Sequence, residues 1–223
     1  VFKERDLKFL ADYDTKIIVN VCGRSKEDYI DAVEQLADTN ADLLEINISC
    51  PNVKEGGIAF GQNPKMAEEI TAAVKKVAKQ PVIMKLSPNV TDITEMAKAA
   101  EAAGADAISL INTLTGMKID IHRRKFALAN KTGGMSGPAI KPVAVRMVYQ
   151  AAHAVKIPVI GMGGIATAED AIEFILAGAT AVSVGAMNFV NPYTTIQVIE
   201  GIEKYMETYG VTDIKDLIGA VNE

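Results

Sequence analysis

Short, almost wholly apolar runs alternate along this chain with longer amphipathic segments, and this alternation constrains the fold more than any other feature. Strands that are covered by helices on both faces have this continuous apolar character, whereas half-exposed strands alternate apolar with polar residues. The predicted strands are Lys16–Val21, Asp42–Ile48, Val82–Leu86, Asp106–Ile111, Pro158–Gly161 and Ala179–Gly185.

The segments between the strands predict helices with recognisable ends. Ser25 is a suitable N-cap with Asp28 at the third helical position, and Pro64 suits a first turn. Gly104 and Gly178 follow two similar helix ends, where a glycine would close each helix before the next strand. The predicted helices run from Ser25 to about Asp38, Pro64 to about Lys79, Thr91 to Ala103, Lys141 to Val155, Thr167 to Ala177 and Pro192 to Tyr209.

Strand–helix units of this kind form parallel sheets with right-handed crossovers. They favour an α/β fold of the TIM (β/α)8 barrel type, with about six of the eight units visible in this sequence. A six-stranded doubly wound sheet is the alternative. The chain opens on a helical piece, Phe2 to Tyr13, that looks like the end of an earlier unit. We therefore expect residues 1–223 to form a single barrel domain that is incomplete at its N-terminus.

Charge and cysteine content restrict the function. The formal net charge of −5 argues against nucleic acids and anionic membranes as partners, because both require a basic surface. The apolar runs are too short for a membrane-spanning helix. The two cysteines are too few to hold an iron–sulfur cluster. One disulfide would be a weak framework for a chain of this length and nothing suggests export, so we expect a cytoplasmic protein with two free thiols.

The most unusual loop follows the second predicted strand. Asn47, Ser49, Cys50 and Asn52 come directly after a buried run, and several glycines follow them. Active sites of parallel barrels lie in the loops after the strands, so this group of amides, hydroxyl and thiol favours a functional site. In the alternative interpretation, Cys50 is a small buried apolar residue and the asparagines form turns.

Polar residues also end two later strands. Lys85 lies in a strand that is otherwise suited to burial, where an ammonium needs compensation. It either faces an anionic ligand or an electron-rich ring, or it forms a structural salt bridge with a carboxylate such as Glu45. Asn112 and Thr113 follow the fourth predicted strand, where they could bind a heterocycle or simply cap the strand.

Glycine-rich turns at the later strand ends indicate a phosphate site. Backbone N–H groups at such turns can bind phosphate, and barrels often bind it after the last two strands. Each run alone could equally be a tight turn. The runs are Gly133–Pro138, Gly161–Ile165 and Gly185-Ala186.

The remaining reactive residue types suggest structural positions. We interpret His122 as loop surface, His153 as helix surface and Cys22 as a packing residue, while Asn20 is expected to point into the barrel mouth. No spacing of His, Cys and carboxylates predicts a metal site.

The segment Asn47-Ile48-Ser49-Cys50-Pro51-Asn52 resembles the class 1 dihydroorotate dehydrogenases, and the resemblance covers essentially the whole chain. The cysteine is typical of class 1, and the continuation to Gly61 is similar to the NAD-linked type B enzymes. The other matching motifs are Lys85-Leu86-Ser87-Pro88, Ile111-Asn112-Thr113, Gly133–Pro142, Gly161–Ile165 and Gly185–Pro192.

The resemblance implies oxidation of dihydroorotate to orotate in pyrimidine (UMP) biosynthesis. Cys50 would be the base, and FMN would be the hydride acceptor. Asn20 and Lys85 would contact the FMN ring system. Its ribityl-phosphate end would be held by Ser136, Gly137, Gly163, Gly164, Gly185 and Ala186. The substrate would be bound by Asn47, Asn52, Asn112 and Thr113.

The resemblance also implies a partner subunit that carries FAD and a 2Fe-2S cluster and passes electrons to NAD. We expect a homodimer at the core of a heterotetramer. Two other functions fit the residues: a flavin-free phosphate-binding barrel of the lyase or isomerase class that uses Lys85, and a non-catalytic fragment.

Overall fold

The computed structural model describes residues 1–49 and 60–222, which form two compact units. Unit 1 comprises Val1–Leu86, Thr94–Ser109 and Val155–Ile157. Unit 2 comprises Ser87–Ile93, Leu110–Ala154 and Pro158–Glu223.

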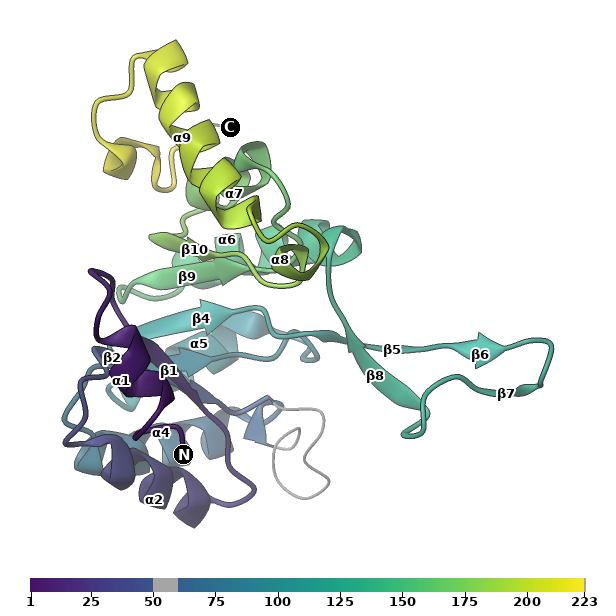
Figure 1. The fold of residues 1–223 in the computed structure, drawn as a ribbon. Helices are drawn as coiled ribbons and strands as arrows, with labels where there is room; N and C mark the ends of the chain where they lie inside the picture. Colours follow the sequence, from purple (N-terminus) through teal and green to yellow (C-terminus); the bar gives the residue numbers. More distant parts are fainter. Residues whose placement is uncertain (50–59, 223) are drawn as a thin grey trace. The chain divides into compact units, whose positions relative to one another are not determined.

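Unit 1 is built on parallel strands in the order β1-β2-β3-β4, with helices before and between them (Figure 1). The strands are β1 (Ile18–Val21), β2 (Leu43–Asn47), β3 (Val82–Lys85) and β4 (Ala107–Leu110). The helices are α1 (Asp6–Leu10), α2 (Lys26–Leu36), α4 (Pro64–Val77) and α5 (Ile93–Ala102).

The helix ends of unit 1 follow their predicted signals. Ser25 Oγ accepts a hydrogen bond from the Asp28 N–H at 3.1 Å, as expected for an N-cap. Pro64 begins α4, and Asn63 caps it through its side chain. Gly104 has a φ of +92°, the left-handed conformation that a glycine supplies after a helix.

Strands β3 and β4 are buried on both faces, as their continuous apolar runs predict. The prediction is wrong for β1, which alternates exposed with buried residues, Ile18 being 49% exposed. Ile83 and Met84 are adjacent in β3, so their side chains point to opposite faces, and both are fully buried. Tyr29 and Val33 of α2 are also fully buried.

Unit 2 contains a parallel strand pair, β9 (Val159–Met162) and β10 (Ala181–Ser183). Its helices are α6 (Lys141–Ala152), α7 (Ala168–Leu176), α8 (Met187–Val190) and α9 (Thr194–Tyr209), with 3-10 turns at Pro138–Ile140 and Ile214–Leu217. Thr167 and Asp170 form a reciprocal capping box at the start of α7. Gly201 lets α9 approach α7 closely, because a Cβ there would lie within 2.4 Å of Ala168 Cβ.

One long antiparallel hairpin in unit 2, made of two strand pairs, was not predicted from the sequence. Strand β5 (Leu114–Met117) pairs with β8 (Thr132–Met135), and β6 (Ile119–Asp120) pairs with β7 (Lys125–Phe126). Together they form a ribbon, residues 114–135, that extends away from the helices of unit 2 (Figure 1). We call this ribbon the arm.

Every predicted strand overlaps a strand of the structure, although the ends differ by a few residues. Strand β10 ends at Ser183, before the predicted Gly185, and α5 begins at Ile93 rather than near Thr91. Within residues 1–49 and 60–222, no helix combines the length and apolar character needed to cross a membrane.

The prediction that Cys22 is a packing residue is wrong. Cys22 is exposed, and its Sγ lies 3.6 Å from Asn20 Oδ1. It follows the last residue of β1, where the chain leaves the buried sheet and turns toward α2. The neighbouring Gly23 is the residue that packs closely, because a Cβ there would lie 2.9 Å from the Tyr29 ring.

We expect Gly161→Ala to destabilise the fold by about 1–3 kcal/mol, because overfilling a packed core forces side chains from their preferred rotamers. The added Cβ would lie 2.7 Å from Phe174 Cδ1 and 3.1 Å from Ala179 Cβ, and both residues are fully buried. Urea unfolding measures the change. Gly116→Ala is the control, since its Cβ would meet nothing closer than 3.6 Å. Equal stability of the two variants would contradict the expectation.

Candidate functional site

Glu45 is the centre of a polar cluster inside unit 1. Its Oε2 accepts hydrogen bonds from Asn20 Nδ2 at 2.5 Å and from Lys85 Nζ at 3.3 Å. Its Oε1 accepts a hydrogen bond from Ser109 Oγ at 2.6 Å. One carboxylate therefore joins side chains from all four parallel strands of the unit, and it brings the predicted residues Asn20 and Lys85 together.

The Lys85–Glu45 ion pair is largely shielded from water, with side-chain exposures of 18% and 12%. A carboxylate removed from water needs compensation, which the three donors around Glu45 supply. The structural interpretation of Lys85 as a partner of Glu45 is thus confirmed. An ammonium has further N–H groups to offer, so this pairing is compatible with a ligand-binding role. From the sequence, Glu45 was expected only as a possible salt-bridge partner of Lys85, and its position at the centre of the cluster was not predicted.

Asn47 fixes the start of the loop that leads to the predicted base. Its Oδ1 accepts hydrogen bonds from the N–H and the Oγ of Ser49 at 3.2 and 3.1 Å. Its backbone oxygen accepts one from the Tyr29 hydroxyl at 2.8 Å. The predicted site residues Cys50 and Asn52 lie outside the described residues.

Asn112 and Thr113 lie in unit 2, just after β4. Asn112 Oδ1 accepts a hydrogen bond from the Thr113 N–H at 2.8 Å, as a capping side chain does. Asn89, which the sequence reading missed, donates from Nδ2 to the Thr113 oxygen at 3.0 Å and accepts at Oδ1 from the Thr115 N–H at 2.9 Å. Its place in the polar run after β3 was the available signal.

Two of the predicted glycine turns meet within unit 2. Gly137, Gly163 and Gly164 have φ values of +86°, +125° and +86°. A Cβ on Gly164 would lie 2.9 Å from the Gly137 oxygen and 2.9 Å from Lys141 Cβ. A Cβ on Gly163 would lie 2.9 Å from Ala144 Cβ. Only glycine permits both the backbone conformation and the close approach.

The third predicted turn lacks these features. Gly185 does not adopt a positive φ, and no neighbouring atom would lie within 4 Å of an added Cβ. Ala186 precedes the short helix α8, and Ser136 is an exposed residue between β8 and Gly137. Phosphate binding by these residues remains a prediction.

The histidines of the described chain lie on the surface, as predicted. His122 is exposed in the arm, and His153 is exposed at the end of α6, where its ring lies 4.1 Å from the Tyr149 ring. Among residues 1–49 and 60–222, no group of three or more His, Cys, Asp or Glu side chains is arranged to hold a metal ion.

Comparison with known proteins identifies the family. The family model described as dihydroorotate dehydrogenase matches residues 2–206. The chain belongs to the dihydroorotate dehydrogenase family. It is 70% identical over 221 residues to the dihydroorotate dehydrogenase B (NAD(+)) catalytic subunit of Lachnoclostridium phytofermentans, covering 99% of this chain and 74% of that protein. It is 65% identical to the protein of the same name from Alkaliphilus metalliredigens, covering 99% and 73%.

A solved structure shows the fold. The chain superposes on dihydroorotate dehydrogenase of Eimeria tenella in complex with ferulenol, with a TM-score of 0.73 and 23% identity. The match covers 87% of this chain and 57% of that chain, so this chain spans a little over half the length of the solved one. The predicted TIM-barrel fold and the resemblance to the NAD-linked type B members of the dihydroorotate dehydrogenase family are confirmed.

In this family member, we expect Glu45→Gln to destabilise the fold by about 2–4 kcal/mol, because it leaves the shielded Lys85 ammonium without its counter-charge. Ser109→Ala is the matched control. It removes one hydrogen bond from the same carboxylate and should cost about 1.5 kcal/mol, the lower end for a hydrogen bond to a charged group. Urea unfolding of both variants measures the difference. If Glu45→Gln costs no more than Ser109→Ala, the charge of Glu45 is not what stabilises the cluster.

Proposed function

We propose that this chain oxidises dihydroorotate to orotate as the FMN-dependent catalytic subunit of an NAD-linked dihydroorotate dehydrogenase. The observation that carries the proposal is the 70% identity to a dihydroorotate dehydrogenase B (NAD(+)) catalytic subunit over 99% of the chain. The polar cluster around Glu45 supports it, since it brings together Asn20 and Lys85, which the family resemblance assigns to the site. The paired glycine turns also support it, since the resemblance assigns Gly137, Gly163 and Gly164 to the phosphate end of FMN.

The glycine turns suit the phosphate of FMN. Gly137, Gly163 and Gly164 adopt positive φ values at positions where a Cβ would either strain the backbone or collide with its neighbours. Side-chain-free turns of this kind can present backbone N–H groups to an anion. In this proposal Ser136, Gly185 and Ala186 complete the phosphate contacts, and Asn20 and Lys85 contact the ring system.

The chain's own residues would bind the substrate and move its proton. Asn47, Asn52, Asn112 and Thr113 hydrogen-bond the dihydroorotate ring, and the Cys50 thiolate removes the proton from C5. A thiolate is a competent base when its surroundings favour the ionised form. The chemistry that bound FMN would supply is that of a hydride acceptor for C6.

A second subunit would complete electron transfer. The similar proteins are named as catalytic subunits, which supports a partner. This sequence has two cysteines, too few for an iron–sulfur cluster, so the proposal places FAD and a 2Fe-2S cluster in that partner.

The experiment for this function is an anaerobic visible spectrum of the FMN-supplied protein before and after addition of dihydroorotate. The wild-type protein should be yellow and should bleach. Cys50→Ser should bind FMN but bleach at least about a hundredfold more slowly, because it lacks the base. Cys22→Ser, at the exposed cysteine, is the matched control and should bleach normally.

The outcomes separate the alternatives. A colourless wild-type protein, still colourless after FMN is supplied, would contradict the flavoenzyme and favour a flavin-free barrel or a non-catalytic fragment. A wild-type rate in Cys50→Ser would leave the flavoenzyme standing and remove Cys50 as its base.

The arm supports the proposed homodimer core. Ile119 and Phe126 are opposite each other in the β6–β7 pair, and opposite residues share a face. Met117 and Ile121 flank Ile119 at alternate positions, and Leu128 lies two residues beyond Phe126. All five side chains are between 44% and 75% exposed. A two-stranded ribbon cannot bury its own apolar face, so this row needs a partner surface.

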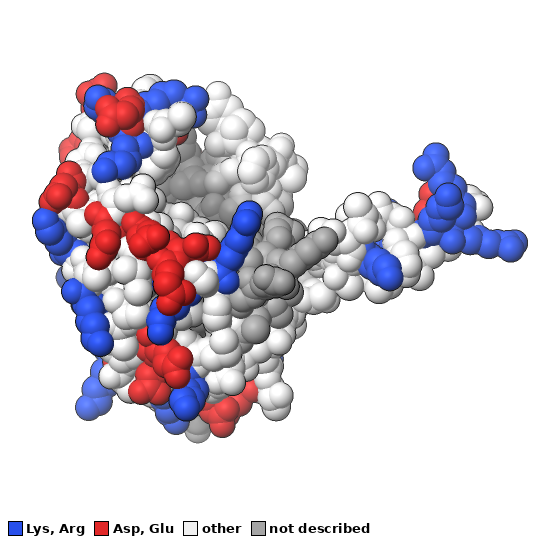
Figure 2. All heavy atoms as spheres, turned by 90° about the horizontal axis from the view of Figure 1, so that it is seen from below, with Lys and Arg blue, Asp and Glu red and all other residues white. Residues whose placement is uncertain are grey.

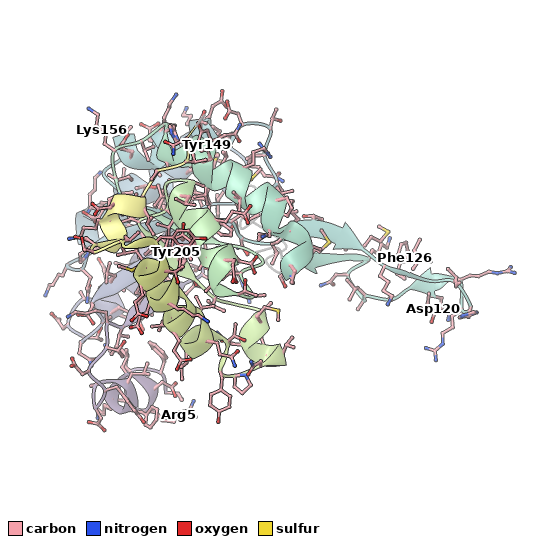
Figure 3. The ribbon with its side chains drawn as sticks, turned by 90° about the horizontal axis from the view of Figure 1, so that it is seen from above. Arg5, Asp120, Phe126, Tyr149, Lys156 and Tyr205 are labelled. Atoms are coloured by element: carbon pink, nitrogen blue, oxygen red, sulfur yellow. The ribbon has the colours of Figure 1, made fainter. Side chains whose placement is uncertain are left out.

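Charge favours a second copy of the chain as that partner. The arm contains five Lys or Arg residues and one Asp, so it is formally +4, whereas the whole chain is −5 and its remainder is therefore −9. Figure 2 shows the basic side chains gathered toward the far end of the ribbon, and Figure 3 places Asp120 and Phe126 on the same ribbon. A basic, apolar arm and an acidic remainder attract each other between two copies.

We expect the double variant Ile119→Ser, Phe126→Ser to raise the dimer dissociation constant by about a hundredfold, because apolar anchors dominate interface energy. Sedimentation equilibrium measures it. Phe9→Ser, at a comparably exposed aromatic residue of α1, is the control and should leave the constant unchanged. A monomeric wild type would contradict the homodimer, and an unaffected double variant would show that the arm is not its interface.

A further inference from the structure

Asp170 connects the loop after Gly164 to α7. Its Oδ2 accepts hydrogen bonds from the N–H groups of Ala166 and Thr167 at 2.9 and 3.0 Å. Its own N–H donates to Thr167 Oγ1 at 3.3 Å. The conformation of the chain between the Gly163–Gly164 turn and α7 is therefore fixed by one carboxylate.

Lys141 extends this connection to the other glycine turn. Lys141 is the first residue of α6 and follows the Gly137 turn by a single 3-10 segment, Pro138–Ile140. Its Nζ donates to Asp170 Oδ1 at 2.7 Å and to Glu173 Oε2 at 2.6 Å. One oxygen of Asp170 thus binds the loop that follows the Gly163–Gly164 turn, and the other binds Lys141 at the start of α6, just after the Gly137 turn.

The backbone shows how tight this connection is. A Cβ on Gly164 would lie 3.0 Å from the Lys141 nitrogen, in addition to its contacts with Gly137. The two turns therefore touch at the point from which Lys141 reaches across to α7. Lys141 therefore ties α7 to the helix that begins beside the Gly137 turn.

The ion pair persists across neutral pH. The hydrogen bonds that Lys141 donates to the carboxylates of Asp170 and Glu173 raise the pKa of Lys141 above its ordinary value of 10.5. Burial raises the pKa of Asp170, but the hydrogen bonds from Lys141 and from the Ala166 and Thr167 N–H groups outweigh it and leave the pKa below 3.8. The stabilisation is therefore lost only as the pH rises through the raised pKa of Lys141 or falls through the lowered pKa of Asp170.

We infer that Lys141 is a positioning residue for the cofactor phosphate: through Asp170 and Glu173 it sets the spacing of the Gly137 and Gly163–Gly164 turns. This inference rests on the proposed function, in which these turns bind the phosphate of FMN. Lys141 acts through the turns and has no direct contact with the cofactor in this role. Positions that orient binding groups from behind commonly govern affinity strongly, because the binding groups must be held within a fraction of an ångström.

The test compares two groups of lysine–carboxylate ion pairs, Lys141 with Asp170 and Glu173, and Lys75 with Asp106; we call each of them a clasp. Lys141→Met removes the ammonium and keeps most of the stem. Lys75→Met is the matched control, because Lys75 pairs with Asp106 at 2.5 Å and has a similar exposure of 29% against 27%. Asp106 also accepts a backbone hydrogen bond, from the Val82 N–H at 2.7 Å, but this clasp lies in unit 1, whereas the glycine turns lie in unit 2.

The measurement is the dissociation constant of FMN for the deflavinated full chain, followed by quenching of flavin fluorescence, together with urea unfolding of each flavin-free variant. Lys141→Met should weaken FMN binding about tenfold or more, while Lys75→Met should change it less than about twofold at a similar loss of stability. Lys141→Arg, which keeps the charge, should restore affinity to within about threefold of wild type.

Two results would overturn the inference alone: equal FMN affinity in Lys141→Met and Lys75→Met, or failure of Lys141→Arg to improve on Lys141→Met. If Lys141→Met does not fold, Glu173→Gln tests the same clasp by removing one of its two acceptors, and it should weaken FMN binding about threefold. Unchanged affinity in Glu173→Gln would then count against the clasp. A wild-type chain that binds no FMN contradicts the proposed function itself.

Discussion

The burial of strands β3 and β4 on both faces is the constraint on which the rest of this structure depends. A strand such as β3 has no solvent-facing side, so a polar side chain within it must find its partners inside the protein. Polar residues are therefore either placed just beyond the strand ends, as Asn112 is, or neutralised within the sheet, as Lys85 is by Glu45. The same constraint makes the strand ends the natural place for chemistry.

Much of this arrangement could be predicted from the sequence, because it depends on local signals. The apolar runs predicted the parallel strands, and Ser25, Pro64 and Gly104 marked helix ends through hydrogen-bonding and backbone requirements that act within a few residues. The contact between the turns at Gly137 and Gly164 follows a different rule. Glycine indicated a tight turn at each position, but only the folded chain shows that the two turns touch.

Features that depend on distant partners escaped prediction. Glu45 is the centre of its cluster because Asn20, Lys85 and Ser109 converge on it from other strands, and no local pattern marks that role. The arm escaped because its strands are short, rich in glycine and exposed, unlike the apolar runs that identified the sheet. Cys22 was misplaced since its apolar neighbours belong to β1, while Cys22 itself lies beyond the strand.

Asn89 gives the arm a mechanical connection to the interior of unit 2. Its side-chain amide donates to the Thr113 oxygen and accepts from the Thr115 N–H, so it grips the root of the arm on either side of Leu114. Asn89 is in turn held by Ser87 Oγ, 3.2 Å from both its backbone and its side-chain nitrogen. These hydrogen bonds fix the base of the arm. Any tilt of the arm must either stretch them or move the segment from Ser87 to Asn89 together with it.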